Sequence, residues 1–140
     1  MKRFVNTLSL IVLSLIALGQ KTDVLIDNIK NNSGLIRVAI YQNQNQFSNE
    51  NAYKLLTFSK SDMKNGQLKV KLDLPSGTYG ISVLDDVNKN AEMDYGMFGI
   101  PKEGFAFSNY YHSGMTLPKF SSFSFKTLPS SKIYCKMKYY

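Results

Sequence analysis

The chain has 140 residues, of which 17 are Lys or Arg and 10 are Asp or Glu, for a formal net charge of +7. A chain of this length builds one modest hydrophobic core, so a second globular domain is not expected. Its lysines are interleaved with apolar residues, which is typical of solvated strand faces, and no basic cluster predicts a nucleic-acid partner.

The N-terminus, Met1–Gly19, has the pattern of a cleavable secretory signal peptide. Basic Lys2 and Arg3 precede an apolar stretch, Phe4–Leu18, and small residues lie just before the predicted cleavage point. Cleavage there leaves Gln20 as the mature N-terminus. The alternative is a membrane anchor, but the apolar run is shorter than the roughly 20 residues that a spanning helix needs. We therefore predict a secreted or periplasmic protein without a membrane span after cleavage.

Apolar residues in the rest of the chain recur with a period of two, which is the signature of half-buried β-strands. Turn signals separate these segments, and Asn65-Gly66 is the strongest because both residues tolerate the positive φ of a tight hairpin. Strands are expected at about residues 23–29, 36–40, 68–72, 79–83, 123–125 and 133–139, with the last two as candidates for pairing. Residues 53–58 fit either a strand or one helical turn. The pattern predicts an all-β fold, a single antiparallel β-sandwich of about seven strands over residues 20–140.

The only cysteine, Cys135, excludes an intramolecular disulfide. It shares one strand face with Ile133 and Met137, so we expect a small buried apolar residue rather than a reactive thiol.

The segment after Leu84 carries an oxygen-bearing side chain at every second residue. These residues are Asp86, Asn88, Asn90, Glu92 and Asp94. Calcium loops place oxygen ligands at positions 1, 3 and 5, a backbone carbonyl at position 7 and a carboxylate at position 9, and the five residues fit those slots. We therefore predict a structural calcium site, with Glu92 supplying its main-chain oxygen.

Two features weaken this predicted calcium site. Ala91 stands where such loops use glycine for a sharp turn, so the backbone must accept strain or follow a wider path. With two certain carboxylates, Asp86 and Asp94, the expected dissociation constant is about 0.1–1 mM. The alternative is a polar hairpin whose Asp and Asn side chains only form turns.

Aromatic residues follow the predicted calcium loop. Phe105 and Phe107 either form a binding surface or fill the end of the sandwich, and large apolar rings favour the second interpretation. Tyr110 and Tyr111 are better placed for exposure and are our candidate ligand contacts. The partner they would bind is an unidentified protein or carbohydrate of the cell envelope.

The sequence offers no recognisable catalytic constellation. His112 is the single histidine, which excludes a multi-histidine zinc site, and no nucleophile motif accompanies it. A small hydrolase would have to pair Asp85 or a neighbouring Asp with Glu103 across a cleft. We predict a non-enzymatic binding or accessory module, with such a hydrolase, or a structural partner in an envelope assembly, as alternatives.

Four motifs, followed in order by Pro118 before the expected Phe123 strand, resemble the exported bacterial family known as domain of unknown function 2141. They are Leu74-Pro75-Ser76-Gly77-Thr78-Tyr79, Asp86-x-Asn88-x-Asn90-x-x-x-Asp94, Gly99-Ile100-Pro101-Lys102-Glu103-Gly104 and Phe107-Ser108-Asn109. The resemblance implies an exported prealbumin-like or immunoglobulin-like sandwich with no assigned activity, and it places an acidic loop on the second motif. Ala91 departs from the family pattern, in which Asn-Gly is usual.

Overall fold

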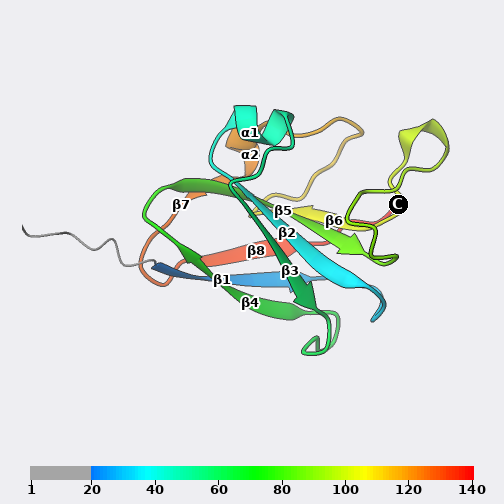
Figure 1. The fold of residues 1–140 in the computed structure, drawn as a ribbon, viewed down its shortest axis with the longest axis horizontal. Helices are drawn as coiled ribbons and strands as arrows, with labels where there is room; N and C mark the ends of the chain where they lie inside the picture. The colour runs from blue at the N-terminus through cyan, green and yellow to red at the C-terminus, as the bar shows by residue number, and fades with distance from the viewer. Residues whose placement is uncertain (1–19) are drawn as a thin grey trace, which may run out of the picture.

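A computed structural model describes residues 20–140 (Figure 1). The predicted signal peptide, Met1–Gly19, lies outside the described residues. Over the described range, no helix has the length and apolar character needed to cross a membrane.

Two sheets form a β-sandwich, which confirms the predicted fold class (Figure 1). The smaller sheet has the order β4 (Leu68–Leu74), β1 (Gln20–Asp27), β8 (Lys132–Lys136). The larger has the order β3 (Lys54–Ser59), β2 (Leu35–Tyr41), β5 (Thr78–Asp86), β6 (Phe105–Phe107), and β7 (Ser124–Lys126) also pairs with β5. Three short helical segments are α1 (Gln44–Ser48), η1 (Met97–Gly99) and α2 (Phe120–Phe123).

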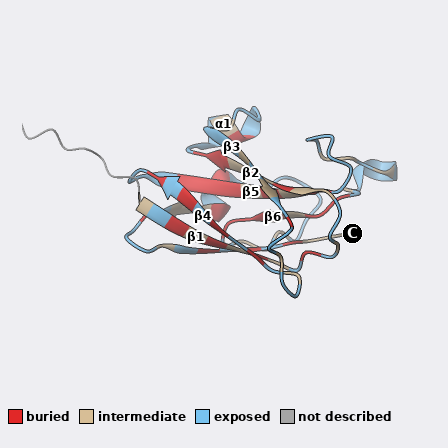
Figure 2. Ribbon diagram, turned by 60° about the horizontal axis from the view of Figure 1, so that its bottom comes forward, coloured by how far each residue is buried: buried red, intermediate tan, exposed pale blue. Residues whose placement is uncertain are grey.

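Alternation along the strands places the core between the two sheets. In β4 the residues Leu68, Val70 and Leu72 are buried while Lys69 and Lys71 are exposed, as a period-two pattern requires. β1 pairs antiparallel with β4, and β2 pairs antiparallel with both β3 and β5. Figure 2 shows buried strand interiors between exposed loops. The hydrophobic period therefore specifies both sheets.

Several predicted details are corrected or settled by the structure. Residues 20–140 contain eight strands, in line with the predicted number of about seven, and β1 pairs in parallel with β8 while the other strand pairs are antiparallel. The predicted pairing of the last two strands is wrong, because β7 joins β5. Phe123 ends helix α2 instead of lying in a strand, and residues 54–59 form a strand and not a helical turn.

Asn65-Gly66 forms the predicted tight turn, with φ values of 51° and 74°. Lys64 and Gln67 exchange two backbone hydrogen bonds of 2.9 Å across it. The flanking strands, β3 and β4, nevertheless belong to different sheets. The turn chemistry thus fixes a local reversal and not a long hairpin.

An aromatic cluster covers the outer face of the larger sheet beneath α1 and α2. It consists of Tyr41, Phe47, Phe107, Phe120 and Phe123. A Cβ added at Gly80 would clash with the Phe123 ring, so only glycine permits this packing. Phe107 is buried and Phe105 is half-buried, in agreement with the interpretation that these rings fill space.

Cys135 lies in the core between the sheets and is fully buried. Burial raises the pKa of its thiol to about 12, so the side chain acts as a small apolar residue, as predicted.

Candidate functional site in the long loop

The end of strand β5 presents two consecutive carboxylates, Asp85 and Asp86, both fully buried. Because successive side chains along a strand point to opposite faces, the two enter different environments. Asp85 pairs in register with core-facing Ile36, and Asp86 pairs with Leu35 on the outer face. One strand end therefore serves two separate polar clusters.

Asp86 organises the start of the loop. One carboxylate oxygen accepts the Asn90 N–H at 3.1 Å, and the other accepts the Ala91 N–H at 3.0 Å and pairs with the Arg37 guanidinium. Desolvation by burial acts to raise the pKa of Asp86, but the hydrogen bonds from Arg37 and the loop N–H groups outweigh it, so the pKa is lowered. Asp86 is therefore an anion that orders the loop backbone.

Asp94 lies at the other end of the same loop and gathers two side-chain amides. The Asn88 amide nitrogen donates to it at 2.6 Å, and the Asn90 amide nitrogen donates to both of its oxygens at 2.9 and 3.0 Å. The Asn90 oxygen in turn accepts the Glu92 N–H at 3.0 Å. No Lys or Arg side chain pairs with Asp94 among the described residues, so amide dipoles alone balance its charge.

Glu103 joins the two ends of the loop through hydrogen bonds to its backbone. Its side chain is buried, and its two oxygens accept the Val87 N–H at 3.1 Å and the Asp94 N–H at 3.4 Å. A surface hollow of about 440 Å³ is lined by Val87, Asn88, Asp94, Tyr95, Lys102 and Glu103. The sequence pattern missed this closing role of Glu103, since no spacing rule links it to the loop.

The structure thus brings together four of the five predicted ligands: Asp86, Asn88, Asn90 and Asp94. The Glu92 side chain is exposed and takes no part in the network, but Glu92 was predicted to supply its main-chain oxygen, so its side chain does not bear on that prediction. Ala91 adopts a φ of +67°, so the loop follows the tight path that glycine would favour and Ala91 carries the strain. Among residues 20–140, no three His, Cys, Asp or Glu side chains converge as a metal-binding group, so a cation here would depend on amide oxygens as well as carboxylates.

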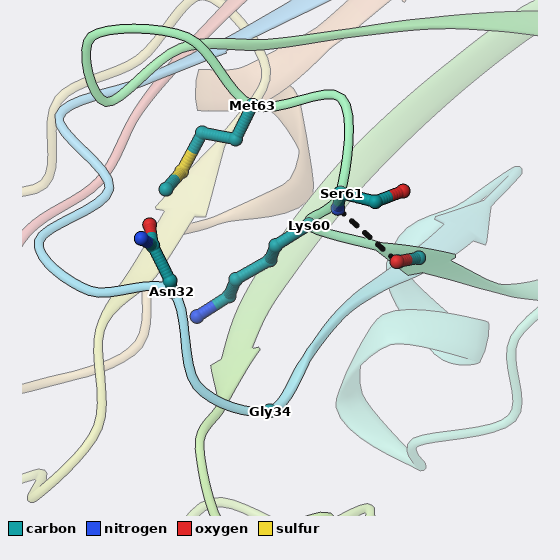
Figure 3. A pocket seen from close by; sticks show the side chains of 6 residues that line it. Asn32, Gly34, Lys60, Ser61 and Met63 are labelled. Atoms are coloured by element: carbon teal, nitrogen blue, oxygen red, sulfur yellow. Dashed lines mark hydrogen bonds between the residues drawn. The ribbon is translucent and has the colours of Figure 1, made fainter.

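The second cluster was not predicted and surrounds Asp85. One oxygen of Asp85 pairs with the Lys60 ammonium, and the other accepts the Tyr139 hydroxyl at 2.6 Å. Lys60 also donates to the backbone oxygens of Ser33 at 2.6 Å and Asn31 at 3.2 Å. Figure 3 shows its side chain running toward the loop that contains Asn32 and Gly34. The ammonium is therefore surrounded by oxygens of the protein.

Burial and close packing support this network of Lys60, Asp85 and Tyr139. The Lys60 and Asp85 side chains are 2% and 0% exposed. Burial and the hydrogen bond to Asp85 raise the pKa of Tyr139 far above its ordinary value, so its hydroxyl stays a donor. A Cβ at Gly104 would clash with the Tyr139 ring, which explains glycine there. Asp85 faces this network and not Glu103, whereas Asp94, another acid of the hydrolase alternative, lines the surface hollow together with Glu103.

The predicted ligand contacts Tyr110 and Tyr111 differ in exposure. Tyr110 is half-buried and packs against the aromatic cluster, whereas Tyr111 is 53% exposed. The Lys136 and Lys138 ammonium groups lie 5.5 and 5.8 Å from the Tyr111 ring centroid. His112 packs between aromatic rings, with its centroid 6.0 Å from those of Phe107 and Tyr110. Tyr111 is therefore the more accessible candidate.

Comparison with known proteins gives one match. The model of a family described as uncharacterised proteins conserved in bacteria matches residues 24–133, which is most of the chain. No curated protein and no solved structure matches the chain.

Proposed function

The chain belongs to the DUF2141 family of proteins conserved in bacteria, and from the geometry of its long loop we propose that it is an exported, non-enzymatic β-sandwich module. In this proposal calcium holds the loop between Asp86 and Asp94, and the module binds a component of the cell envelope. The observation that carries the proposal is the Asp94 carboxylate, which lies among amide groups with no positively charged partner in the described part of the chain.

The Asn88 and Asn90 side chains now donate to Asp94, and each can turn its amide oxygen toward a cation instead. A side-chain amide carries NH₂ and oxygen on opposite sides, so a half-turn of each amide presents oxygen where NH₂ now faces Asp94. The turn gives up the hydrogen bonds in which the two amide oxygens now accept the Asn90 and Glu92 N–H groups at 3.2 and 3.0 Å, and the cation has to compensate for them. Calcium takes six to eight oxygen ligands and accepts carboxylate, amide and backbone oxygens together. Asp86, Asp94, the two turned amides and the main-chain oxygen of Glu92 would supply most of such a set, and water would complete it. Bound calcium would add positive charge at Asp94 and rigidify the loop.

Arg37 limits the affinity that this loop could reach. It already neutralises Asp86, whose oxygens also order the Asn90 and Ala91 N–H groups. Asp86 therefore contributes less charge to a cation than an unpaired carboxylate would. A weak site of this kind suits an exported protein, because extracellular calcium modules operate at about 0.1–1 mM.

The proposed binding surface is centred on Tyr111. An exposed ring flanked by Lys136 and Lys138 offers a flat apolar face together with positive charge. Aromatic faces stack on sugar rings, and lysines attract carboxylate or phosphate groups. An acidic envelope carbohydrate therefore fits this surface best.

Calcium binding is tested by thermal unfolding of the full chain with EDTA and with about 5 mM calcium, a concentration above the expected dissociation constant. We expect calcium to raise the Tm by about 4 °C. Asp94→Ala should abolish the increase, whereas Asp62→Ala, which removes an exposed carboxylate on another turn, should preserve it. An unchanged Tm, confirmed by calorimetric titration without heat, would refute the calcium part of the proposal.

Carbohydrate binding is tested separately by titrating acidic envelope polysaccharide fractions. Tyr111→Ala should weaken binding at least about fivefold, because it removes the stacking face. Tyr53→Ala, at a ring that is 44% exposed elsewhere, serves as the matched control. Equal effects of the two substitutions would argue against a surface at Tyr111.

A further inference from the structure

Residues 94–102 form a protruding hairpin, here called the finger. Lys102 N–H donates to the Asp94 carbonyl at 2.8 Å, and Gly96 N–H donates to the Ile100 carbonyl at 2.7 Å. The finger ends in the short helical turn η1 and projects from the sandwich, in yellow-green in Figure 1. Backbone hydrogen bonds thus give the finger a defined shape.

The tip of the finger is apolar and exposed. Tyr95, Met97, Phe98 and Ile100 are 60%, 78%, 89% and 40% exposed, and Figure 2 shows the turn in the colour of exposed residues. Single exposed apolar residues are normal on a protein surface. Four within six residues on one projecting turn are an unusual concentration of exposed apolar surface, and such concentrations mark interaction sites.

Phe98 also has a strained backbone, with a φ of +59°. Large side chains rarely adopt the left-handed region, and the cost is usually offset by packing. Phe98 is 89% exposed, so little packing inside the chain offsets it. The ring is therefore left free to contact something outside the molecule, whose binding could offset the strain.

The shape and size of the tip favour a lipid bilayer over a protein partner. The tip projects from the sandwich, so its side chains can be buried only by inserting into a concave pocket or into a lipid bilayer. Four side chains cover far less than the roughly 1,200 Å² of a stable protein interface. A bilayer needs no matching pocket, and each inserted apolar side chain adds to binding independently. Tyrosine at the rim suits the headgroup zone, where aromatic rings are enriched.

The net charge of the chain suits an anionic bilayer. Lys89 and Lys102 are both exposed on the long loop. The Lys102 side chain lies alongside Gly96 in the finger, because a Cβ added at Gly96 would be 3.5 Å from the Lys102 Cε atom. Glu92 and Asp94, the two nearby acids that are neither buried nor paired with a basic side chain within residues 20–140, carry as much negative charge as these two lysines carry positive charge, so the attraction to anionic lipid comes from the chain as a whole. The whole chain carries a formal net charge of +7, and +5 remains when Lys2 and Arg3 leave with the predicted signal peptide (7 − 2 = 5), so anionic lipids would attract it at long range.

We propose that the finger inserts Phe98 and Met97 into the interfacial zone of anionic lipid bilayers and so docks the protein on a membrane surface. This docking does not depend on calcium at the loop or on the Tyr111 surface, so it can fail or succeed independently of the proposed function.

The chain contains no tryptophan, so Phe98→Trp provides a single fluorescent reporter at the tip. With vesicles of phosphatidylethanolamine and phosphatidylglycerol, we expect a blue shift of its emission and quenching by brominated lipid. Leu117→Trp, at a site that is 70% exposed on another loop, should show neither. All variants are full chains processed identically, so residues 1–19 cannot explain a difference between them.

Affinity is tested with Phe98→Asp, which removes the ring and keeps a residue that tolerates positive φ. Vesicle partitioning should fall at least about tenfold, whereas Leu117→Asp should change it less than about twofold. An unshifted emission spectrum of the Phe98→Trp variant, an equal shift for Leu117→Trp, or wild-type partitioning of Phe98→Asp would overturn the proposal. Self-association that depends on Phe98, without vesicle binding, would also overturn it and assign the tip to a second copy of the chain.

Discussion

Asp85 and Asp86 are neighbours on one strand, yet they belong to regions that handle charge in opposite ways. Asp85 lies in a closed network in which Lys60 and Tyr139 occupy both of its oxygens. Asp86 begins an open loop that ends at Asp94. The Asp94 carboxylate accepts hydrogen bonds from two neutral amides and, in the part of the chain that the structure describes, has no ion pair with a basic side chain. The closed network supplies its own cation, whereas the Asp94 end of the loop has no basic side chain paired with it among residues 20–140.

This difference follows from burial. Removing an ammonium and a carboxylate from water costs several kcal/mol per ion, so a buried pair persists only when nearly every polar atom is satisfied. Lys60 meets this condition through the Ser33 and Asn31 oxygens. Asn88 and Asn90 are exposed, so water can replace their partners at low cost. The closed network is expected to set stability, and the open loop is expected to respond to ligands.

The largest effect is expected from breaking the closed network with Lys60→Met. The substitution leaves Asp85 buried without its cation, and we expect a loss of about 3–5 kcal/mol in the free energy of unfolding, measured with urea. Adding Asp85→Asn removes the stranded charge and should restore part of the loss.

Lys21→Met is the control for this experiment, because it breaks an ion pair whose side chains are 67% and 58% exposed. Its effect should stay below about 1 kcal/mol. A loss of similar size for Lys21 and Lys60 would contradict the assignment of the network as the main charged anchor.

A smaller effect, with a distinct pH dependence, is expected at the start of the open loop. The folded pKa of Asp86 lies below the ordinary value of 3.8. Its contribution to stability is therefore fully present above the unfolded pKa and is lost as the pH falls through the folded pKa. Arg37→Met should cost about 1.5–3 kcal/mol at pH 7, the range for hydrogen bonds to charged groups.

Because protonation of Asp86 removes what Arg37 stabilises, the cost of Arg37→Met should shrink as the pH falls below 3.8. Urea unfolding at several pH values between neutral and about pH 3 measures this, with Lys71→Met at an exposed pair as the control. A cost that is the same at every pH would show that Arg37 acts through packing and not through the charge of Asp86.

The two regions also differ in how far the sequence predicts them. Alternation revealed strands such as β4, and the spacing from Asp86 to Asp94 singled out the loop whose side chains do converge. The closed network could not be predicted from the sequence, because Lys60, Asp85 and Tyr139 are far apart along the chain. They meet only when the two sheets pack face to face. Phe123 was misassigned because two alternating residues look alike in a strand and in a short helix. Local periodicity therefore predicts elements, while long-range polar contacts depend on the topology.

The smallest effect is expected at Ala91. The calcium-loop pattern has glycine at this turn, and the structure gives Ala91 the positive φ that glycine favours. Its φ of +67° costs an L-residue conformational energy that glycine avoids. Ala91→Gly should raise the free energy of unfolding by about 0.5–1 kcal/mol, since relief of strain exceeds the added entropy of the unfolded chain. If the loop binds calcium, the same change should tighten binding, because less strain opposes the tight turn. Ala52→Gly, where φ is not positive, should instead be neutral or destabilising. Urea unfolding of both variants measures the comparison, and a loss of stability at Ala91 would show that its methyl group packs more favourably than its backbone is strained.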